Sequence, residues 1–103
     1  MKLLEELGLP ELTDEQIEEL CWITEEAARK YVYSKVPSKI IETLNIAAEA
    51  EGTKPVKLTV DVDITLSSLM KDFDTQELAD ESLRRAFASA KEYLRRLACH
   101  SQE

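Results

Sequence analysis

Two aspartates two positions apart come nearest to metal chemistry in this sequence. Asp61 and Asp63 stand in the alternating stretch LTVDVDI, residues 58–64. Side chains at alternate strand positions share a face, so the two carboxylates could hold a hydrated divalent ion, with help from Asn45 or Thr43. Alternating charge also keeps an exposed strand soluble. We expect the second role, and therefore no metal site.

The other reactive residue types form no recognisable catalytic set. His100 follows Cys99, but structural zinc needs four ligands at recognisable spacing. No serine or cysteine stands in a glycine-rich elbow, and Gly8 and Gly52 are isolated, which excludes phosphate-binding loops. We therefore expect no catalytic residues, no cofactor and two free thiols, the second being Cys21.

Trp22 is the aromatic residue that most needs an explanation. At about 100° per helical residue it lies away from the apolar stripe of its segment, in the same sector as Arg29 and Tyr33. Trp, Tyr and Arg are favoured anchors of partner surfaces. The alternative is that the leading segment folds back over the indole. That segment supplies the leucines Leu3, Leu4, Leu7 and Leu9.

A basic stripe of Arg84, Lys91 and Arg95 shares an arc of the last predicted helix and could follow a phosphate backbone. Acidic residues one turn away favour a salt-bridged, solvated face instead. The pairs expected at this spacing are Asp80 with Arg84, Glu81 with Arg85, and Glu92 with Arg96. No aromatic residues are interleaved with the stripe, so nucleic acid is the less favoured partner.

Two capped helices must position these residues. The first starts at Thr13, with Gln16 completing a capping box, and ends near Lys35 because Val36 precedes a proline. The second spans residues 74–97, with Asp74 as its cap and Glu77 at the third position. Its apolar stripe consists of Ala79, Ser82, Leu83, Ala86, Phe87, Ala90, Tyr93, Leu94 and Leu97.

Between the helices the hydrophobic period changes to two. Apolar residues occupy the even positions of 44–50 and again of 56–66, separated by the turn sequence GTKP. This predicts a hairpin, with Ala48 near Leu58 and Ile46 near Val60, although the register could slip by two.

The element order predicts an α+β fold of two layers, α-β-β-α, in which two long helices pack on the apolar face of an antiparallel hairpin. Residues 1–103 form one domain, with 1–11 as a leading segment and 98–103 as a fraying tail. A two-stranded sheet has two open edges. Either Lys57, Asp61 and Asp63 protect them by charge, or an edge pairs with another chain.

Composition limits the class of protein. The chain has 103 residues, with 13 Lys and Arg against 21 Asp and Glu, for a net charge of −8, and is 44% hydrophobic. This composition excludes disorder, and the acidic balance repels phosphate. Apolar stretches are too short to span a membrane and the N-terminal residues do not resemble a signal peptide, so we expect a cytoplasmic protein.

The whole pattern resembles a family of short uncharacterised archaeal proteins. The resemblance rests on the capped first helix, the Val36-Pro37 break, the alternating hairpin ending in LTVDVDI and the helix from Asp74 to Leu97. It implies an archaeal cytoplasmic protein of unknown activity, from a family associated with genes near the prefoldin beta subunit. It assigns no active residues.

The sequence therefore predicts a non-enzymatic protein-binding or assembly module, either a homodimer or part of a protein complex. The alternative is an RNA-associated protein that uses the basic stripe. A small metal-assisted enzyme built on Asp61 and Asp63 comes third.

Overall fold

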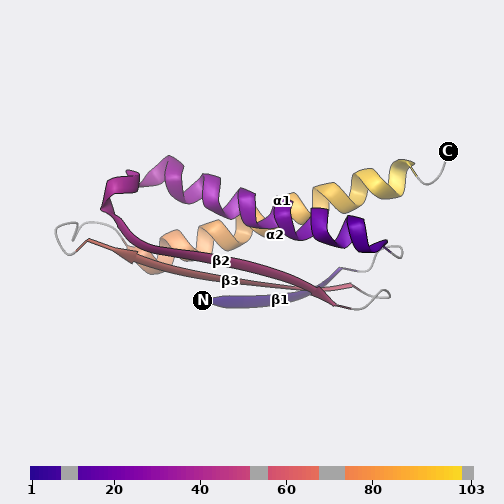
Figure 1. Ribbon diagram of the computed structural model, residues 1–103, viewed down its shortest axis with the longest axis horizontal. Coiled ribbons are helices and arrows are strands. Elements are labelled where there is room, and N and C mark those ends of the chain that lie inside the picture. Colours follow the sequence, from indigo (N-terminus) through magenta and orange to yellow (C-terminus); the bar gives the residue numbers. More distant parts are fainter. Residues whose placement is uncertain (8–11, 52–55, 68–73, 101–103) are drawn as a thin grey trace.

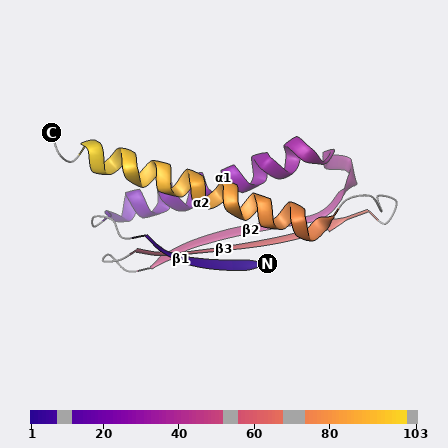
Figure 2. The ribbon, with the colours of Figure 1, turned by 180° about the vertical axis from the view of Figure 1, so that it is seen from behind.

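In the computed structural model, two long helices cover one face of a three-stranded antiparallel sheet (Figures 1 and 2). The structure describes residues 1–7, 12–51, 56–67 and 74–100. The elements are β1 (Lys2–Leu7), α1 (Asp14–Lys35), the short 3₁₀ helix η1 (Ser38–Ile40), β2 (Ile41–Glu51), β3 (Val56–Leu66) and α2 (Thr75–His100). The two-layer α+β architecture predicted from the sequence is confirmed.

Local signals in the sequence define both ends of α1. The Thr13 hydroxyl accepts from the backbone N–H of Gln16 at 3.1 Å, and the Gln16 side chain accepts from the N–H of Thr13 at 2.9 Å. The predicted capping box is therefore confirmed. Val36 has an extended backbone at the C-terminal cap, as expected for a residue before proline.

The start of α2 follows the same local rule. An Asp74 carboxylate oxygen accepts from the N–H of Glu77 at 3.1 Å, which satisfies one of the free donors at the helix start. The helix continues past Leu97 to His100, so its backbone extends into the segment expected to fray. Residues 101–103 lie outside the described residues.

The sheet confirms the predicted parity. Leu58, Val60 and Val62 of β3 are at most 1% exposed beneath the helices, whereas Lys57 and Asp63 are exposed on the other face. The expected pairing is two residues off, because Ala48 lies opposite Val60. A two-residue slip keeps every side chain on its face, so hydrophobic periodicity does not distinguish the two registers.

Strand β1 was not predicted. The leading segment pairs antiparallel with β3, with Leu3 opposite Val60 and Glu5 opposite Leu58, and makes β3 the central strand. The sequence KLLEEL has no strict alternation, so its conformation depends on the β3 edge, which lies far along the chain.

The central position of β3 also corrects the predicted edge protection. Lys57, Asp61 and Asp63 all belong to β3, which has a neighbour on each side, so they cannot protect an edge. The edges of the sheet are β1 and β2. Strand β2 carries no lysine, arginine or proline over its whole length.

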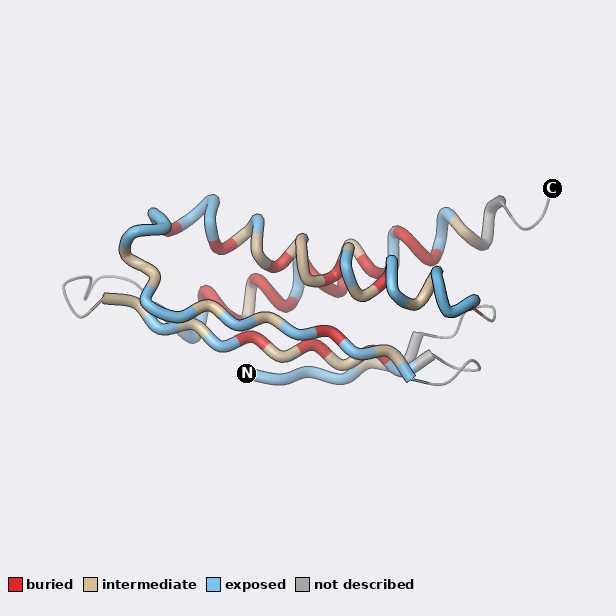
Figure 3. Tube along the Cα trace, viewed as in Figure 1, coloured by how far each residue is buried: buried red, intermediate tan, exposed pale blue. Residues whose placement is uncertain are grey.

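The core lies between the two layers, where the inner faces of the helices and strands are buried (Figure 3). Ala86 and Ala90 of α2 have no exposed surface, which allows α2 to approach its neighbours closely. Near the end of α1, the Tyr31 ring lies 5.3 Å from the guanidinium carbon of Arg85, a cation–π contact that joins the two helices.

Candidate functional site

The outward side of α1 carries the three residues predicted for a partner surface, and we call Trp22, Arg29 and Tyr33 the α1 flank. Trp22 is 63% exposed and Tyr33 49%, while Arg29 is partly buried and paired with Glu26. Both aromatic rings face solvent because the buried residues of α1 lie on its opposite side.

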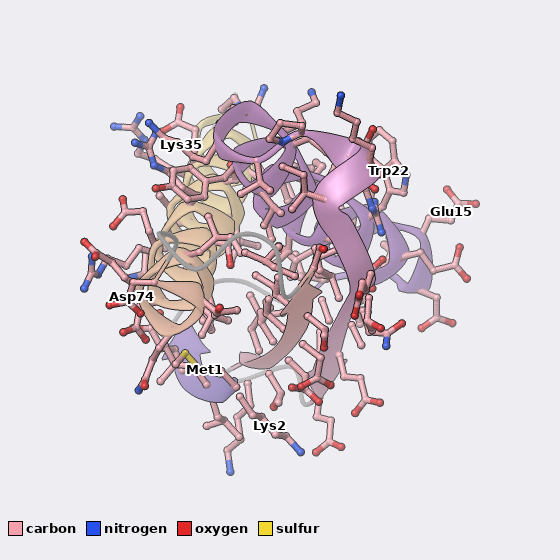
Figure 4. The ribbon with its side chains drawn as sticks, turned by 90° about the vertical axis from the view of Figure 1, so that its left-hand side faces the viewer. Met1, Lys2, Glu15, Trp22, Lys35 and Asp74 are labelled. Carbon is pink, nitrogen blue, oxygen red and sulfur yellow. The ribbon has the colours of Figure 1, made fainter. Side chains whose placement is uncertain are left out.

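The leading segment does not cover Trp22. Leu3 and Leu4 belong to β1, the sheet edge farther from β2, and remain 43% and 56% exposed. Trp22 lies on the other side of the molecule, beside β2 (Figure 4). The interpretation that the leading leucines cover the indole is therefore wrong for Leu3 and Leu4. Leu7 belongs to the same strand, and Leu9 lies outside the described residues.

The open edge of β2 lies next to the α1 flank. Val62 exchanges backbone bonds with Met1, so even-numbered residues of β3 bond toward β1 and odd-numbered ones toward β2. The backbone groups of Leu44, Ile46, Ala48 and Ala50 consequently point away from the sheet. We call these four residues the β2 edge.

Two side chains of α1 reach part of this edge. A Glu25 carboxylate oxygen accepts from the N–H of Ala48 at 2.9 Å, and Cys21 interacts with the N–H of Ala50. Among the described residues, the N–H groups of Leu44 and Ile46 have no hydrogen-bond partner. The β2 edge is therefore half covered and half open.

Cys21 is a poor nucleophile in this setting. Burial raises the pKa of its thiol, the Glu25 carboxylate raises it further, and the Ala50 N–H lowers it. A raised pKa keeps the sulfur protonated near neutral pH. Its surroundings thus fit a packing role, and the thiol is free as predicted.

The candidate metal pair lies on the open face of the sheet. The Met1 ammonium is 3.7 Å from Asp61 and 3.6 Å from Asp63, so a cationic group of the chain already lies between them. Asn45 lies opposite Asp63. Over the described ranges, no three His, Cys, Asp or Glu residues are grouped so that they could hold a metal ion. The side chain of His100 lies outside this description.

The predicted basic stripe is exposed, but each of its residues has an acidic partner. Arg84 lies 2.5 Å from Glu81, and Lys91 lies 3.5 Å from Glu5 of β1. Arg95 pairs with Glu92. The hydrogen bond from Arg84 is the main reason that the pKa of Glu81 is lowered. These pairs reduce the positive charge available to a phosphate backbone.

A shallow pocket of about 210 Å³ opens between the helices. The Tyr93 hydroxyl donates to Glu19 at 3.1 Å, and burial together with this bond raises the pKa of Tyr93 to about 12. The lining residues are Glu19, Ile23, Tyr93, Arg96 and Leu97. The sequence assigned Tyr93 to the core but gave no signal for its partner, because the two residues are 74 positions apart.

A second pocket of about 270 Å³ is lined by Met1, Lys2, Leu3, Asp80, Leu83 and Arg84.

The fold and these surfaces define a class of small two-layer α+β proteins in which two helices cover one face of a three-stranded antiparallel sheet. The chain belongs to the family described as "Protein of unknown function (DUF3194)", which matches residues 9–93. The resemblance inferred from the sequence is thereby confirmed at the level of the family.

Similar proteins are found in archaea. An uncharacterised protein of Thermococcus kodakarensis is 26% identical over 97 residues, covering 94% of this chain and 89% of that protein. An uncharacterised protein of Pyrococcus furiosus is 24% identical over 98 residues, covering 95% and 87%.

Solved structures share the fold. A crystal structure from Thermococcus onnurineus superposes with a TM-score of 0.80 at 24% identity, covering 97% of this chain and 96% of that one. The solution structure of a hypothetical protein from Methanothermobacter thermautotrophicus superposes with a TM-score of 0.71 at 22% identity. The match covers 85% of this chain and 94% of that one. None of the helices in the described ranges is both long and apolar enough to cross a membrane.

Proposed function

We propose that this protein is a non-enzymatic protein-binding or assembly module whose contact surface is the α1 flank. The observation that carries the proposal is the exposure of Trp22, at 63%, on the side of α1 opposite to its buried residues. An exposed tryptophan gains much from burial in a complex, because its ring removes a large apolar area from water.

The neighbours of Trp22 support a protein partner. Tyr33 and Arg29 share its side of the helix, and these three residue types dominate the binding energy of protein interfaces. Charged residues such as Glu26 surround the aromatic rings and can form the polar rim of an interface.

The alternative, RNA association through Arg84, Lys91 and Arg95, has less support. All three cations are ion-paired, and the net charge of −8 opposes a polyanion. Cytoplasmic location is part of the proposal and follows from the sequence expectation alone.

Affinity capture from a native lysate tests the proposal. Wild-type protein, Trp22→Ala and a matched control, Leu4→Ala, are compared, with and without nuclease. The side chain of Leu4 is exposed to a similar extent to that of Trp22, but it lies on β1, at the sheet edge away from β2. We expect a protein or a second copy of the chain to be retained by the wild type and the control and lost with Trp22→Ala.

Two results would contradict the proposal. Retention of all partners by Trp22→Ala would remove the α1 flank from the interface. Loss of partners on nuclease treatment, and equally on substitution of Arg84 and Arg95 by glutamine, would support the RNA alternative instead.

A further inference from the structure

We propose that the α1 flank binds a basic segment of a partner protein, with an arginine of that segment stacked on Trp22 and paired with Glu18. This inference rests on the proposed function, since the surface is the same. It adds the chemistry of the partner and the side chains that recognise it.

The nearest neighbours of Trp22 on the helix surface are all acidic. Side chains three and four positions apart on a helix lie beside one another. The residues at these positions on either side of Trp22 are Glu18, Glu19, Glu25 and Glu26. An exposed indole among carboxylates is a favourable place for a cation, because the negative face of the ring and the carboxylates attract it together.

The first half of α1 contains no basic residue that could neutralise these carboxylates. Residues 14–26, DEQIEELCWITEE, include six acidic residues and neither lysine nor arginine. Asp14 and Glu15 both lie at a spacing from Glu18 where like charges repel, so a bound cation would relieve that repulsion. Trp22 and Glu15 project to the same side of the molecule (Figure 4).

The neighbouring elements make the β2 side of the flank more negative than the α2 side. Strand β2 carries no lysine or arginine over its whole length. Burial raises the pKa of the Cys21 thiol, and the carboxylates of Glu25 and Glu49 raise it further, which places both negative charges close to this part of α1. On the α2 side, Arg96 lines a pocket together with Glu19 and offsets its charge.

Glu18 is the glutamate available to an incoming cation. Glu19 is bonded to α2, Glu25 is bonded to β2, and Glu26 is paired with a cation of α1 itself. Among the described residues, the exposed carboxylate of Glu18 has no hydrogen-bond or ion-pair partner. It lies one helical turn from Trp22, so a single guanidinium can contact both the ring and the carboxylate.

The cations of α1 itself leave the indole ring uncovered. Arg29 is paired with Glu26, which shows that a carboxylate of this face already holds one guanidinium. In the described part of the chain, the cation–π contacts are made with Tyr31 and not with Trp22. Lys30 lies about 80° round the helix from Trp22. The ring is therefore open to a cation from another molecule.

An arginine of an extended segment fits this surface better than a small free cation. The planar guanidinium can stack on an aromatic ring while it donates to a carboxylate. Tyr33 lies on the same side of α1, about 16 Å along the helix from Trp22. About five residues of extended chain span that distance, so one segment can contact both rings.

Fluorescence titration tests the inference, because Trp22 is the single tryptophan of the chain. The probe is a short peptide of alternating arginine and serine, compared with peptides that carry lysine or glutamate in place of arginine. We expect a saturable change in indole emission with the arginine peptide and weaker binding of the lysine peptide. The glutamate peptide should not bind.

Two matched variants locate the contact. Glu18→Gln should raise the dissociation constant of the arginine peptide about two- to fivefold, as for an exposed ion pair. The control, Glu77→Gln, removes the same charge from an exposed glutamate near the start of α2 and should leave the constant unchanged. Trp22→Ala, measured by calorimetry, should weaken binding by a similar factor to Glu18→Gln. Thermal unfolding shows whether each variant is folded.

Three results would overturn the inference. Equal weakening by Glu18→Gln and Glu77→Gln would mean that the peptide responds only to net charge. An unchanged dissociation constant with Trp22→Ala would remove the stacked arginine. Equal affinity for spermine, a polyamine without a peptide backbone, would make a free cation the ligand.

Competition in the capture experiment separates this inference from the proposed function. Displacement of a captured protein by the arginine peptide, and not by the glutamate peptide, would support both. A protein or a second copy of the chain that is held through Trp22 but not displaced would overturn the basic segment and leave the binding function. Capture that does not depend on Trp22 would overturn both.

Discussion

At the scale of single residues, two side-chain contacts join parts of the chain that are distant in sequence. Glu25 of α1 bonds to the edge of β2, and Tyr93 of α2 bonds to Glu19 of α1. Each places an acidic group against a donor that would otherwise lack a partner at the margin of the core. Their removal should affect stability in different ways.

Replacing Glu25 with alanine should destabilise the fold by about 1 to 2 kcal/mol, because the N–H of Ala48 loses a charged acceptor. Chemical denaturation measures the loss, and hydrogen exchange at Ala48 should become faster. Glu25→Gln keeps an acceptor oxygen and should recover most of the stability. The matched control is Glu26→Ala, which breaks a partly exposed ion pair within α1 and should change little. Equal losses at the two positions would contradict the role given to the Ala48 bond.

Because of Tyr93, the free energy of unfolding should decrease at alkaline pH. Its folded pKa of about 12 exceeds the ordinary value of 10.0, because burial and then the bond to Glu19 disfavour the phenolate. A raised folded pKa means that the folded state holds the proton more tightly, so its contribution is complete below pH 10 and is lost between about pH 10 and 12. Tyrosinate absorbance should show one tyrosine titrating late. Tyr93→Phe should remove both the late titration and this part of the pH dependence.

At the scale of elements, the helices and strands differ in how far the sequence determines them. Caps such as Thr13 with Gln16 act over three residues, and both helix starts could therefore be predicted. Strand β1 could not, because the residues with which it pairs, Val56 to Asp61, lie about fifty to sixty positions away. The register of the hairpin was missed for a related reason, since it depends on turn geometry and not on hydrophobic period.

The residues of the candidate site also differ in how far the sequence predicts their surroundings. The exposure of Trp22 follows from its angle on a single helix and could be predicted. The contact between Glu25 and Ala48 spans 23 positions and depends on how α1 packs over β2. The partners of Lys91 and Tyr93, Glu5 and Glu19, are equally invisible in the sequence, because each lies on another element.

The close approach of α2 to its neighbours leads to a prediction about packing. Ala86 is fully buried, so Ala86→Leu should overpack the contact and destabilise the fold by about 1 to 3 kcal/mol. The matched control is Ala88→Leu, two residues away on the exposed side of the same helix. Thermal unfolding compares the two variants. Equal melting temperatures would show that the predicted apolar stripe of α2 does not face the core.

At the scale of the whole molecule, the fold is a long, thin, two-layer body of 52 × 21 × 19 Å. Only one face of the sheet is covered by helices, and one long edge remains partly open. Such a shape has a large surface for its length of chain, and its helix-covered core depends on the sheet remaining intact.

Removing residues 1–7 should therefore have an effect beyond the loss of one strand. The deletion uncovers the backbone of β3, whose even-numbered residues bond to β1. We expect a melting temperature lower by about 5 °C or more and concentration-dependent aggregation, because a newly exposed strand edge can pair with other chains. Circular dichroism should still show both helices. A truncated chain as soluble and stable as the full one would mean that β1 contributes little to the sheet.

The pairing of β1 with β3 also fixes an order of events during translation. β1 leaves the ribosome before its partner residues, Val56 to Asp61, which follow about fifty to sixty positions later in the chain. Until then β1 has no strand to bond with, while α1, stabilised by its own capping box, can already form. The sheet is completed by the middle strand, so nascent chains that end before β3 should expose β1 to proteases, and chains that include β3 should protect it.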